Sequence, residues 1–352
     1  MLSDARNPSA LDPTALYRLR DGAYAADLVL AAVSKFDLFD WLVHHGPVPA
    51  VELCEAMGWA ARPADVLLTL CAAHGLIERF VEADDLVAVS EFGRWHLSGD
   101  TSFDLRPYYG SLAERPGVAE FASVLRTDRP AAWASAAPNG APGSDWSGRL
   151  SDPHFAAGIT AAMDARGAFL APTAAQVLRD LPIRRLLDIG GSSGIYAMAL
   201  LEDRPDAAAT VLERSPVDDA ARTLLSSRGA GERIEVVTAD MFADPWPHGC
   251  DTHLFSQVLH DWDAERVEQL LAASHKALAP GGLLIDLDAH VDGRRTGPLP
   301  VAEYSALLMH STPGKCWSVD ELAGIAARVG FVGVEVRPCA GDRSALVFTK
   351  AP

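Results

Sequence analysis

The chain lacks the features that would place it in a membrane or in a disulfide-bonded secreted class. Its 352 residues contain no apolar run near the ~20 residues that a membrane helix needs. The first residues, Met-Leu-Ser-Asp-Ala-Arg-Asn-Pro, lack the apolar core of a signal peptide. The five cysteines are odd in number and form no Cys-x-x-Cys pair, so we interpret them as reduced thiols. These absences predict a cytoplasmic protein without a membrane partner.

Positive charge is also scarce. The chain has 30 lysines and arginines against 47 acids, a net charge of −17. Contact with a phosphate backbone requires clustered cations, so we expect no nucleic-acid partner and a small-molecule substrate. The length suggests two domains with ample room for a core.

The most informative stretch is residues 184–196. An apolar run ends at Asp188, a glycine-rich turn follows, and an alanine- and leucine-rich helix pattern comes next. This is the strand–turn–helix order of a nucleotide-binding α/β unit, in which glycines let the backbone approach a ligand and the helix start offers free N–H groups. A dinucleotide fingerprint starting at Gly190 would need glycine where the chain has Ser192 and Ile195, so NAD or FAD fits poorly.

The remaining order, Asp188-x-Gly190-x-x-x-Gly194, resembles motif I of class I S-adenosylmethionine (SAM) methyltransferases. The resemblance implies that Asp188, Gly190, Gly191 and Gly194 bind SAM. An acid suits a ligand that carries an amino group and a sulfonium, with no phosphate to repel. Most members of that class have glycine where this chain has Ser192. The alternative is an ordinary corner between a strand and a helix.

The rest of the chain alternates strand and helix patterns, which predicts a parallel sheet with helices on both faces. Residues 156–352 are therefore expected to form a Rossmann-like, seven-stranded α/β methyltransferase domain, with ligands at the carboxyl ends of its strands. Strands are predicted near residues 184–189, 208–213, 234–237, 251–256, 282–288, 332–337 and 345–349, and helices near 155–179, 194–203, 216–228, 263–278 and 318–329.

Residues 1–105 predict an α-helical winged helix. Apolar residues at helical spacing predict one long helix over residues 16–41, followed by two shorter helices and two short strands near 76–81 and 86–89. A winged helix suggests DNA binding. The composition argues against it, because Arg62 and Arg79 are the only lysines or arginines between residues 43 and 89, where acids outnumber them.

This region resembles the N-terminal dimerisation domain of the caffeic acid O-methyltransferase-like family. The matching segments are Phe36-Asp37-Leu38-Phe39-Asp40, Gly46-Pro47, Glu52-Leu53-Cys54, Arg62, Leu67–Leu70 and Gly75-Leu76-Ile77-Glu78. The resemblance implies a homodimer, with this domain helping to roof the substrate pocket. Residues 106–155 would then be a linker with substrate-pocket helices.

The same resemblance assigns roles to the predicted strand ends. Glu213 ends the second strand about 25 residues after Asp188, near the spacing of an acid that accepts ribose hydroxyls. The alternative for Glu213 is a solvated strand-end acid. In the family, the acid of Asp240-Met241-Phe242 contacts the adenine amino group and the apolar pair walls the ring, while Ser256-Gln257 lies near the methionine part of SAM. A helix bordering the SAM site corresponds to residues 159–163.

The segment Val258-Leu259-His260-Asp261-Trp262 is the most specific short motif. In the family, the histidine at this place is the general base that removes a phenol proton, and histidine suits that work because its pKa lies near neutrality. Its usual partner is an acid that ends the fifth strand, here Asp288. A second acid usually follows a Gly-Lys pair, but this chain has Cys316 there, which departs from the pattern of simple O-methylation.

A second histidine, His310, precedes Cys316 by six residues. With His260 and a carboxylate it would make a site for a divalent metal, Fe or Zn. The pattern resembles a bacterial subset of the family, the metal-dependent 2-oxo acid C-methyltransferases, which includes the phenylpyruvate C-methyltransferase of mannopeptimycin biosynthesis. The resemblance implies two histidine ligands to the metal. The alternative for His310 is a structural histidine at a helix end.

Three hypotheses follow. The first is a SAM-dependent methyltransferase of bacterial secondary metabolism that methylates C3 of a 2-oxo acid with metal assistance. The second is metal-free O-methylation of a phenolic small molecule, with His260 as base and Asp288 orienting it. The third is a SAM-binding dimer that is not a methyltransferase.

Overall fold

The computed structural model describes residues 12–132 and 146–351. The chain divides into two compact units. The first, here the sheet unit, comprises Met1–Tyr17, Gly143–Ala289 and Glu321–Pro352, and the second, the helical unit, comprises Arg18–Pro142 and His290–Asp320. Residues 133–145 of the predicted linker lie outside the described residues.

The sheet unit is built on a seven-stranded sheet in the order β6-β5-β4-β7-β8-β10-β9. Its first five strands along the chain run parallel, and β10 pairs antiparallel with both β8 and β9. The apolar runs of the sequence form the buried central strands, as expected for a sheet covered on both faces. The strands are β4 (Arg185–Ile189), β5 (Ala208–Glu213), β6 (Ile234–Thr238), β7 (Thr252–Ser256), β8 (Leu283–Asp288), β9 (Phe331–Cys339) and β10 (Arg343–Lys350).

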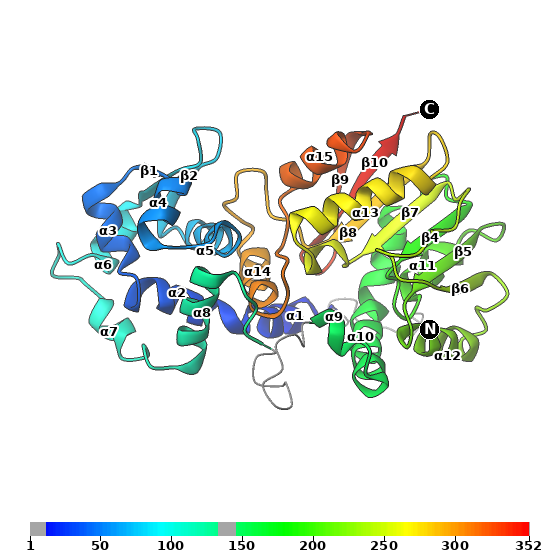
Figure 1. Ribbon diagram of the computed structural model, residues 1–352, viewed down its shortest axis with the longest axis horizontal. Coiled ribbons are helices and arrows are strands. Elements are labelled where there is room, and N and C mark those ends of the chain that lie inside the picture. Colours follow the sequence, from blue (N-terminus) through cyan, green and yellow to red (C-terminus); the bar gives the residue numbers. More distant parts are fainter. Residues whose placement is uncertain (1–11, 133–145, 352) are drawn as a thin grey trace. The chain divides into compact units, whose positions relative to one another are not determined.

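Helices cover both faces of this sheet (Figure 1). Right-handed crossovers that run outward from β4 in opposite directions place α11 and α12 on one face and α13 on the other. The helix α10 packs beside α11, and its Leu170, Ala171 and Ala174 share a buried core with Leu186 of β4. The helices of this part of the chain are α9 (Trp146–Arg149), α10 (Pro153–Val177), α11 (Ile195–Glu202), α12 (Val217–Ser227), η4 (Leu259–Asp261), α13 (Ala264–Ala277) and α15 (Val319–Arg328). The predicted seven-stranded α/β fold with a mostly parallel sheet is therefore confirmed.

The helical unit combines short helices with a three-stranded antiparallel sheet in the order β1-β3-β2. The predicted strands are present as β2 and β3, and Val48 and Pro49 add the short strand β1 beside β3. The elements of this region are α1 (Thr14–Asp21), η2 (Gly22–Tyr24), α2 (Ala25–Ser34), α3 (Leu38–His45), β1 (Val48–Pro49), α4 (Ala50–Met57), α5 (Ala61–Ala73), β2 (Ile77–Phe80), β3 (Leu86–Val89), α6 (Glu91–Leu97), α7 (Arg106–Gly110), α8 (Pro116–Thr127) and α14 (Leu299–Ser311).

The prediction of one long helix over residues 16–41 is wrong. The segment forms α1, a 3-10 turn, α2 and the start of α3. Asp37 takes a left-handed conformation with φ of 50°, which ends the helical path and starts a new helix in another direction. Apolar spacing continues across the break because α2 and α3 both contribute to the same core, which includes Leu28, Leu38 and Leu42.

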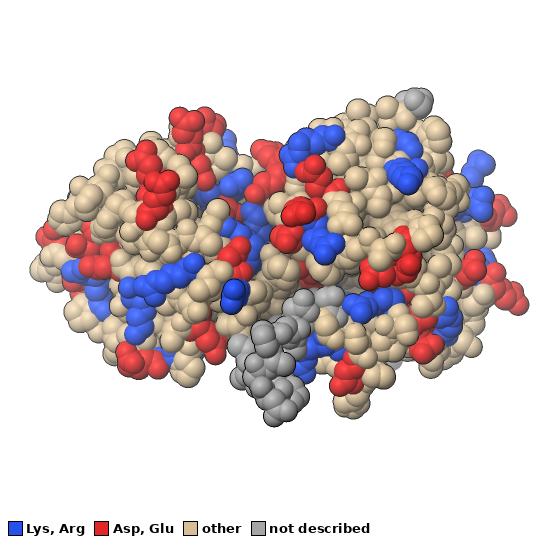
Figure 2. All heavy atoms as spheres, viewed as in Figure 1, with Lys and Arg blue, Asp and Glu red and all other residues tan. Residues whose placement is uncertain are grey.

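Charged residues in the helical unit are largely paired with one another. The Arg79 side chain is 1% exposed and its guanidinium bonds to Asp65 and Asp85 at 2.7 Å. Arg62 bonds to Asp128 at 2.7 Å and to the carbonyl oxygen of Gly314 at 2.6 Å. The two arginines between residues 43 and 89 are thus engaged within the unit. On the face drawn in Figure 2, acidic and basic side chains are interspersed.

Among the described residues, no helix is both long and apolar enough to cross a membrane.

Candidate active site

The carboxyl ends of the parallel strands bring the predicted site residues of the sheet unit to one edge. Ile189 of β4 pairs with Leu212 of β5 and with Phe255 of β7, so Asp188, Glu213 and Ser256 end neighbouring strands. Asp288 ends β8, the next strand along this edge. Because parallel strands end at the same edge, the spacing in sequence becomes proximity in space.

The glycine-rich turn, residues 190–194, has the backbone that the sequence predicts. Gly190 and Gly194 have φ of 66° and 73°, values that glycine adopts at little cost. A Cβ on Gly191 would lie 2.5 Å from Cγ of Asp188, so any larger residue would collide with that carboxylate. Ser192 also has a left-handed backbone, with φ of 51°, at the position where glycine is usual. Its N–H donates to Oε1 of Glu213 at 3.0 Å, which helps hold the strained turn.

Two carboxylates face this turn, the buried Asp188 and the half-buried Glu213. Burial and the nearby charge of Glu213 raise the pKa of Asp188 to about 7. Burial likewise raises the pKa of Glu213 to about 7, against N–H donors from Arg214 and Ser192 that favour its charged form. One oxygen of Asp188, Oδ2, is buried with no hydrogen-bond partner among the described residues. A buried acceptor without a donor is costly, so the site suits a ligand with a positively charged donor group.

The segment after β6 provides an apolar wall at the same edge. Oδ1 of Asp240 accepts the N–H of Phe242 at 2.8 Å, and the carboxylate remains exposed. The Phe242 ring stands edge-on to Trp262 at 4.6 Å between centroids, and the Arg266 guanidinium covers it at 4.7 Å. Trp246 Nε1 donates to the carbonyl oxygen of Met241 at 2.9 Å, which fixes the loop.

The residues at the end of β7 are hydrogen-bonded to β8, α11 and β4. Gln257 has φ of 59°, and its N–H donates to Leu287 O at 2.9 Å. Its Nε2 donates to the Tyr196 hydroxyl at 2.6 Å, an interaction the sequence did not predict. Ser256 Oγ lies 3.5 Å from Asp188 Oδ1, so the β7 end and the glycine-rich turn are joined.

The predicted base and its partner form a buried pair. Nδ1 of His260 lies 2.7 Å from Oδ1 of Asp288, and the two side chains are 5% and 3% exposed. Nε2 lies 3.6 Å from Oδ1 of Asp261, beyond ordinary hydrogen-bond distance. Burial alone would lower the pKa of His260, but the carboxylates of Asp288 and Asp261 outweigh it and raise that pKa. The imidazole is thus oriented by one acid with its second nitrogen directed elsewhere.

Two charged residues of this cluster were not assigned roles from the sequence. Burial raises the pKa of Asp261 to about 6. The positive charge of Arg166 in α10 lowers the pKa of both His260 and Asp261, so it favours the neutral imidazole and the ionised carboxylate. The sequence held a signal for Arg166, since it follows by three residues the segment 159–163 predicted to border the site.

His310 lies in the helical unit, where its partner is an acid distant in sequence. Nε2 of His310 is 2.8 Å from Oε2 of Glu120, and the ring packs against Tyr24 and Phe121 with centroids 4.6 and 5.2 Å away. Nδ1 is buried with no hydrogen-bond partner in residues 12–132 or 146–351. Within those same residues, no group of three or more His, Cys, Asp or Glu side chains is arranged to hold a metal ion. The predicted Fe or Zn site on His260 and His310 is therefore not supported.

The segment that carries Cys316 is fixed to α5. The Lys315 ammonium pairs with Asp65 and lies 4.9 Å from the centre of the Trp317 ring. Cys316 is buried, and its N–H donates to Ser305 Oγ at 3.1 Å. Cys316 thus occupies a packed position, consistent with a small structural residue.

Comparison with known proteins gives the family. A family model described as an O-methyltransferase domain matches residues 120–332, more than half of the chain. The chain belongs to this O-methyltransferase family. With relatives that are named methyltransferases and a similar structure that contains SAM, the protein is a SAM-dependent methyltransferase. The hypothesis of a SAM-binding dimer without this activity is set aside.

Three similar proteins illustrate the family. A 3-hydroxy-5-methyl-1-naphthoate 3-O-methyltransferase of Streptomyces sahachiroi is 28% identical, over 89% of this chain and 88% of its own. The structure of an O-methyltransferase family 2 protein from Planctomyces limnophilus, complexed with apigenin, is 27% identical with a TM-score of 0.84, covering 98% and 97% of the two chains. An O-methyltransferase from neocarzinostatin biosynthesis, complexed with SAM and 2-hydroxy-5-methyl naphthoic acid, is 25% identical with a TM-score of 0.58, covering 94% and 96%.

These relatives correct the predicted resemblance to the 2-oxo acid C-methyltransferases. The methyltransferase was expected to belong to the metal-dependent 2-oxo acid C-methyltransferases, but the similar proteins are named O-methyltransferases of naphthoates and other polyketides. The replacement of an acid by Cys316 was the main sequence argument for C-methylation. The structure keeps the His260–Asp288 pair intact without that acid, so the replacement does not argue against O-methylation.

Proposed function

We propose that the protein transfers a methyl group from SAM to a hydroxyl of an aromatic small molecule, of the naphthoate or polyketide kind, in natural-product biosynthesis. The observation that carries the proposal is the buried His260–Asp288 pair at 2.7 Å, at the edge where the glycine-rich turn also lies. Relatives named for hydroxynaphthoate O-methylation support the substrate class.

The chemistry assigned to the pair follows from its hydrogen bond. An ionised carboxylate only accepts, so Nδ1 of His260 donates to Asp288 and Nε2 carries the lone pair of the neutral ring. Nε2 takes the proton of the substrate hydroxyl, and the oxygen becomes the nucleophile that forms the new bond to carbon. Asp288 and Asp261 stabilise the imidazolium that results. SAM, when bound, supplies the methyl group on a sulfonium whose C–S bond breaks to leave a neutral thioether.

The residues of the sheet unit fit SAM. The buried Asp188 Oδ2 suits the amino group, and the close backbone of the glycine-rich turn suits a ligand that lies directly on it. We assign Asp188, Gly190, Gly191 and Gly194 to the methionine and ribose side. We assign Glu213 to the ribose hydroxyls, Asp240, Met241 and Phe242 to the adenine, and Ser256 and Gln257 to the methionine part. All these residues lie at or directly after the carboxyl ends of β4 to β7.

A substrate panel tests this function. Purified protein with SAM is expected to methylate hydroxynaphthoates, to leave the matched naphthoates without a hydroxyl unchanged, and to leave 2-oxo acids unchanged. Mass spectrometry detects the product, and carbon NMR distinguishes an O-methyl from a C-methyl group. A C-methylated 2-oxo acid would overturn the proposal in favour of the metal-assisted hypothesis.

His310→Ala separates the two hypotheses. Under O-methylation we expect turnover to survive, with a loss of roughly 1–3 kcal/mol in unfolding free energy from the removed buried side chain. EDTA should then have no effect, and metal analysis should give no stoichiometric Fe or Zn. Glu120→Gln, which keeps the volume of the His310 partner, is the matched control. Parallel loss of activity and bound metal would restore the metal hypothesis.

We also propose that residues 1–105 form a dimerisation domain. Large apolar side chains are exposed on α6 and the segment after it, including Phe92 at 56%, Trp95 at 45% and Phe103 at 60%. Such a patch on a water-facing surface marks an interface, and the resemblance to a dimerisation domain names a second copy as its partner. Sedimentation equilibrium at micromolar concentration is expected to give twice the chain mass; a stable monomer would refute this.

A further inference from the structure

A buried tyrosine of α11 is bonded to the chain that follows β7. The hydroxyl of Tyr196 accepts a hydrogen bond from Nε2 of Gln257 at 2.6 Å, and each residue is 6% exposed. Burial raises the pKa of Tyr196 to about 12, so the hydroxyl is neutral near pH 7. Because α11 begins where the glycine-rich turn ends, this hydrogen bond joins the helix after the turn to the residues that precede His260.

Gln257 lies between two residues that contact the β4 end and the glycine-rich turn. Ser256 Oγ is 3.5 Å from Oδ1 of Asp188, and a Cβ on Gly190 would lie 3.1 Å from Cγ2 of Val258. Gln257 itself has φ of 59°, a conformation that a residue other than glycine holds only when its surroundings impose it. Its backbone is bonded to β8 and its side chain to α11, so both neighbours fix its orientation.

Only one end of the Gln257 amide is engaged by the protein. Its Oε1 is buried and has no hydrogen-bond partner within residues 12–132 or 146–351. A buried acceptor is costly unless a ligand supplies the donor. The ammonium group in the methionine part of SAM has N–H donors of the kind that Oε1 accepts, and Gln257 is assigned to that part of the ligand.

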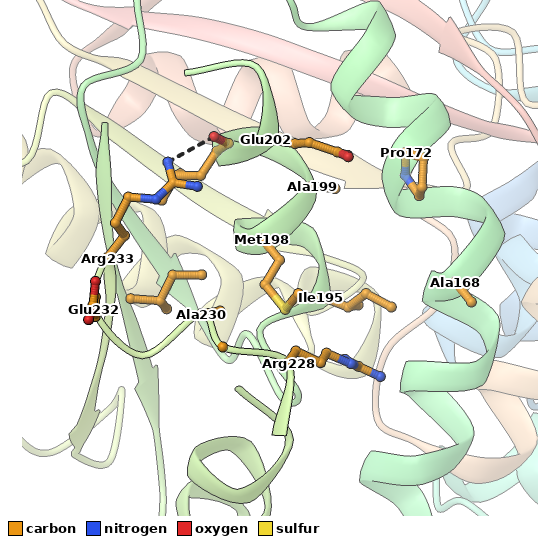
Figure 3. A pocket seen from close by; sticks show the side chains of 13 residues that line it. Ala168, Pro172, Ile195, Met198, Ala199, Glu202, Arg228, Ala230, Glu232 and Arg233 are labelled. Carbon is orange, nitrogen blue, oxygen red and sulfur yellow. Dashed lines mark hydrogen bonds between the residues drawn. The ribbon is translucent and has the colours of Figure 1, made fainter. Parts of the chain in front are cut away.

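One face of α11 packs incompletely. Ile195, Met198 and Glu202, at helical spacing, line a groove of about 460 Å³ between α10, α11 and the loop before β6 (Figure 3). Close packing is present at Gly167 of α10, where a Cβ would lie 2.5 Å from Cγ2 of Ile195. Tyr196 does not line the groove and belongs to the buried core of the sheet unit. The contacts of this buried face therefore hold α11 against the sheet.

We propose that Tyr196 is a positioning residue of the SAM site, which fixes the Gln257 amide so that Oε1 accepts the ammonium group of SAM. The proposal rests on the assignment of SAM to the glycine-rich turn. In Tyr196→Phe the amide loses the partner of Nε2, and a buried donor without an acceptor favours other orientations of the side chain. Because Tyr196 acts through Gln257, its hydroxyl should matter only to ligands that carry the amino-acid part.

Two ligands test the proposal by calorimetry, without any methyl acceptor. S-adenosylhomocysteine carries the amino-acid part, and methylthioadenosine lacks it. Tyr196→Phe is expected to weaken S-adenosylhomocysteine binding about tenfold, as for a hydrogen bond to a charged group, and to leave methylthioadenosine binding unchanged. An equal loss for both ligands, or no loss for S-adenosylhomocysteine, would overturn the proposal.

Gln257→Met shows whether Tyr196 acts through the amide. This variant should also lose about tenfold in S-adenosylhomocysteine affinity, and the double variant with Tyr196→Phe should lose no more, because the two residues act as one unit. The double variant should melt above Tyr196→Phe, since it has no unsatisfied amide. Recovery of affinity together with stability would make the role of Tyr196 merely structural, and a further loss would show that Tyr196 acts independently of Gln257. If Tyr196→Phe does not fold, Gln257→Met and the double variant decide the matter.

Ser274→Ala is the matched control for the loss of a buried hydroxyl. Ser274 is fully buried, and its Oγ lies 2.9 Å from Nδ1 of His253 in the same unit. This variant should melt at a lower temperature and bind both ligands as the wild type does; the same selective loss as in Tyr196→Phe would overturn the proposal. The substrate panel tests the methyl acceptor and Gly190→Val tests the SAM assignment, so the failure of either is distinguishable from the failure of the role of Tyr196.

Discussion

Replacing His260 by alanine is expected to reduce methyl transfer by about 10²- to 10⁴-fold, the usual contribution of a general base. The variant loses the nitrogen that we propose accepts the substrate proton, while the glycine-rich turn keeps its contacts to β5. Single-turnover rates with SAM and an accepted hydroxynaphthoate measure the loss. S-adenosylhomocysteine binding, measured by calorimetry, should be unchanged.

His253→Ala is the matched control. His253 is also a fully buried histidine of the sheet unit, with Nδ1 2.9 Å from Ser274 Oγ, but it lies within β7 and away from the carboxyl edge. Its removal should lower stability and leave the rate per folded molecule near that of the wild type. Equal losses in the two variants would show that His260 matters for stability and is not the base.

The pH dependence gives this assignment a second test. The base must be neutral, so kcat/KM should fall as the pH is lowered and His260 becomes protonated. Asp288 and Asp261 raise the pKa of His260 despite burial, so in the wild type this fall should begin at a pH above the 6.5 of an ordinary histidine. Asp288→Asn removes one of those charges, and its amide can donate to Nδ1 and so place the proton on Nε2. We expect a rate loss on the order of 10²- to 10⁴-fold, with the acidic limb moved to lower pH.

Gly190→Val is expected to weaken SAM binding by roughly 10- to 100-fold, the equivalent of about 1–3 kcal/mol of backbone strain. Gly190 has φ of 66°, and its Cβ would lie 3.1 Å from Cγ2 of Val258, so a branched side chain meets both strain and contact. The turn would move away from the position that places Asp188 and its own N–H groups at the ligand. Calorimetry with SAM measures the change.

Gly281→Val separates strain from the binding effect. Gly281 has a similar φ of 71° with open space around its Cβ position, and it precedes β8, at the opposite edge of the sheet. Both variants should lose stability through the backbone, but only Gly190→Val should lose SAM. Unchanged affinity in Gly190→Val would show that SAM binds elsewhere.

The sequence predicted best where local chemistry and topology agree. Asp188, Glu213, Ser256 and Asp288 follow apolar runs, and the rule that ligands bind at the carboxyl ends of parallel strands placed them together. The His260–Asp288 pair was also predictable, because each residue stands beside a recognisable strand end. For these residues, the order of strands and turns along the sequence is enough to predict which side chains lie at the carboxyl edge of the sheet.

What the sequence could not give are contacts between distant segments. Glu120 bonds to His310 across 190 positions, and Asp164 bonds to Arg228 across 64. No local spacing encodes such pairs, because they depend on how helices pack after they form. The same limit explains the long N-terminal helix that was predicted wrongly, since a left-handed Asp37 leaves the apolar periodicity almost unchanged.

The raised pKa values of Asp188 and Glu213 at the glycine-rich turn imply that protons are bound and released when a ligand binds there. Asp188 and Glu213 each have a pKa of about 7 without ligand, so near neutrality the empty site retains roughly one proton between them. A cationic ligand favours their ionised forms and expels that proton on arrival. By linkage, the apparent affinity for SAM weakens as pH falls below 7. Our assignment of SAM to this turn therefore predicts that SAM binding releases a proton and that the release of S-adenosylhomocysteine, which has lost the sulfonium charge, is accompanied by proton uptake.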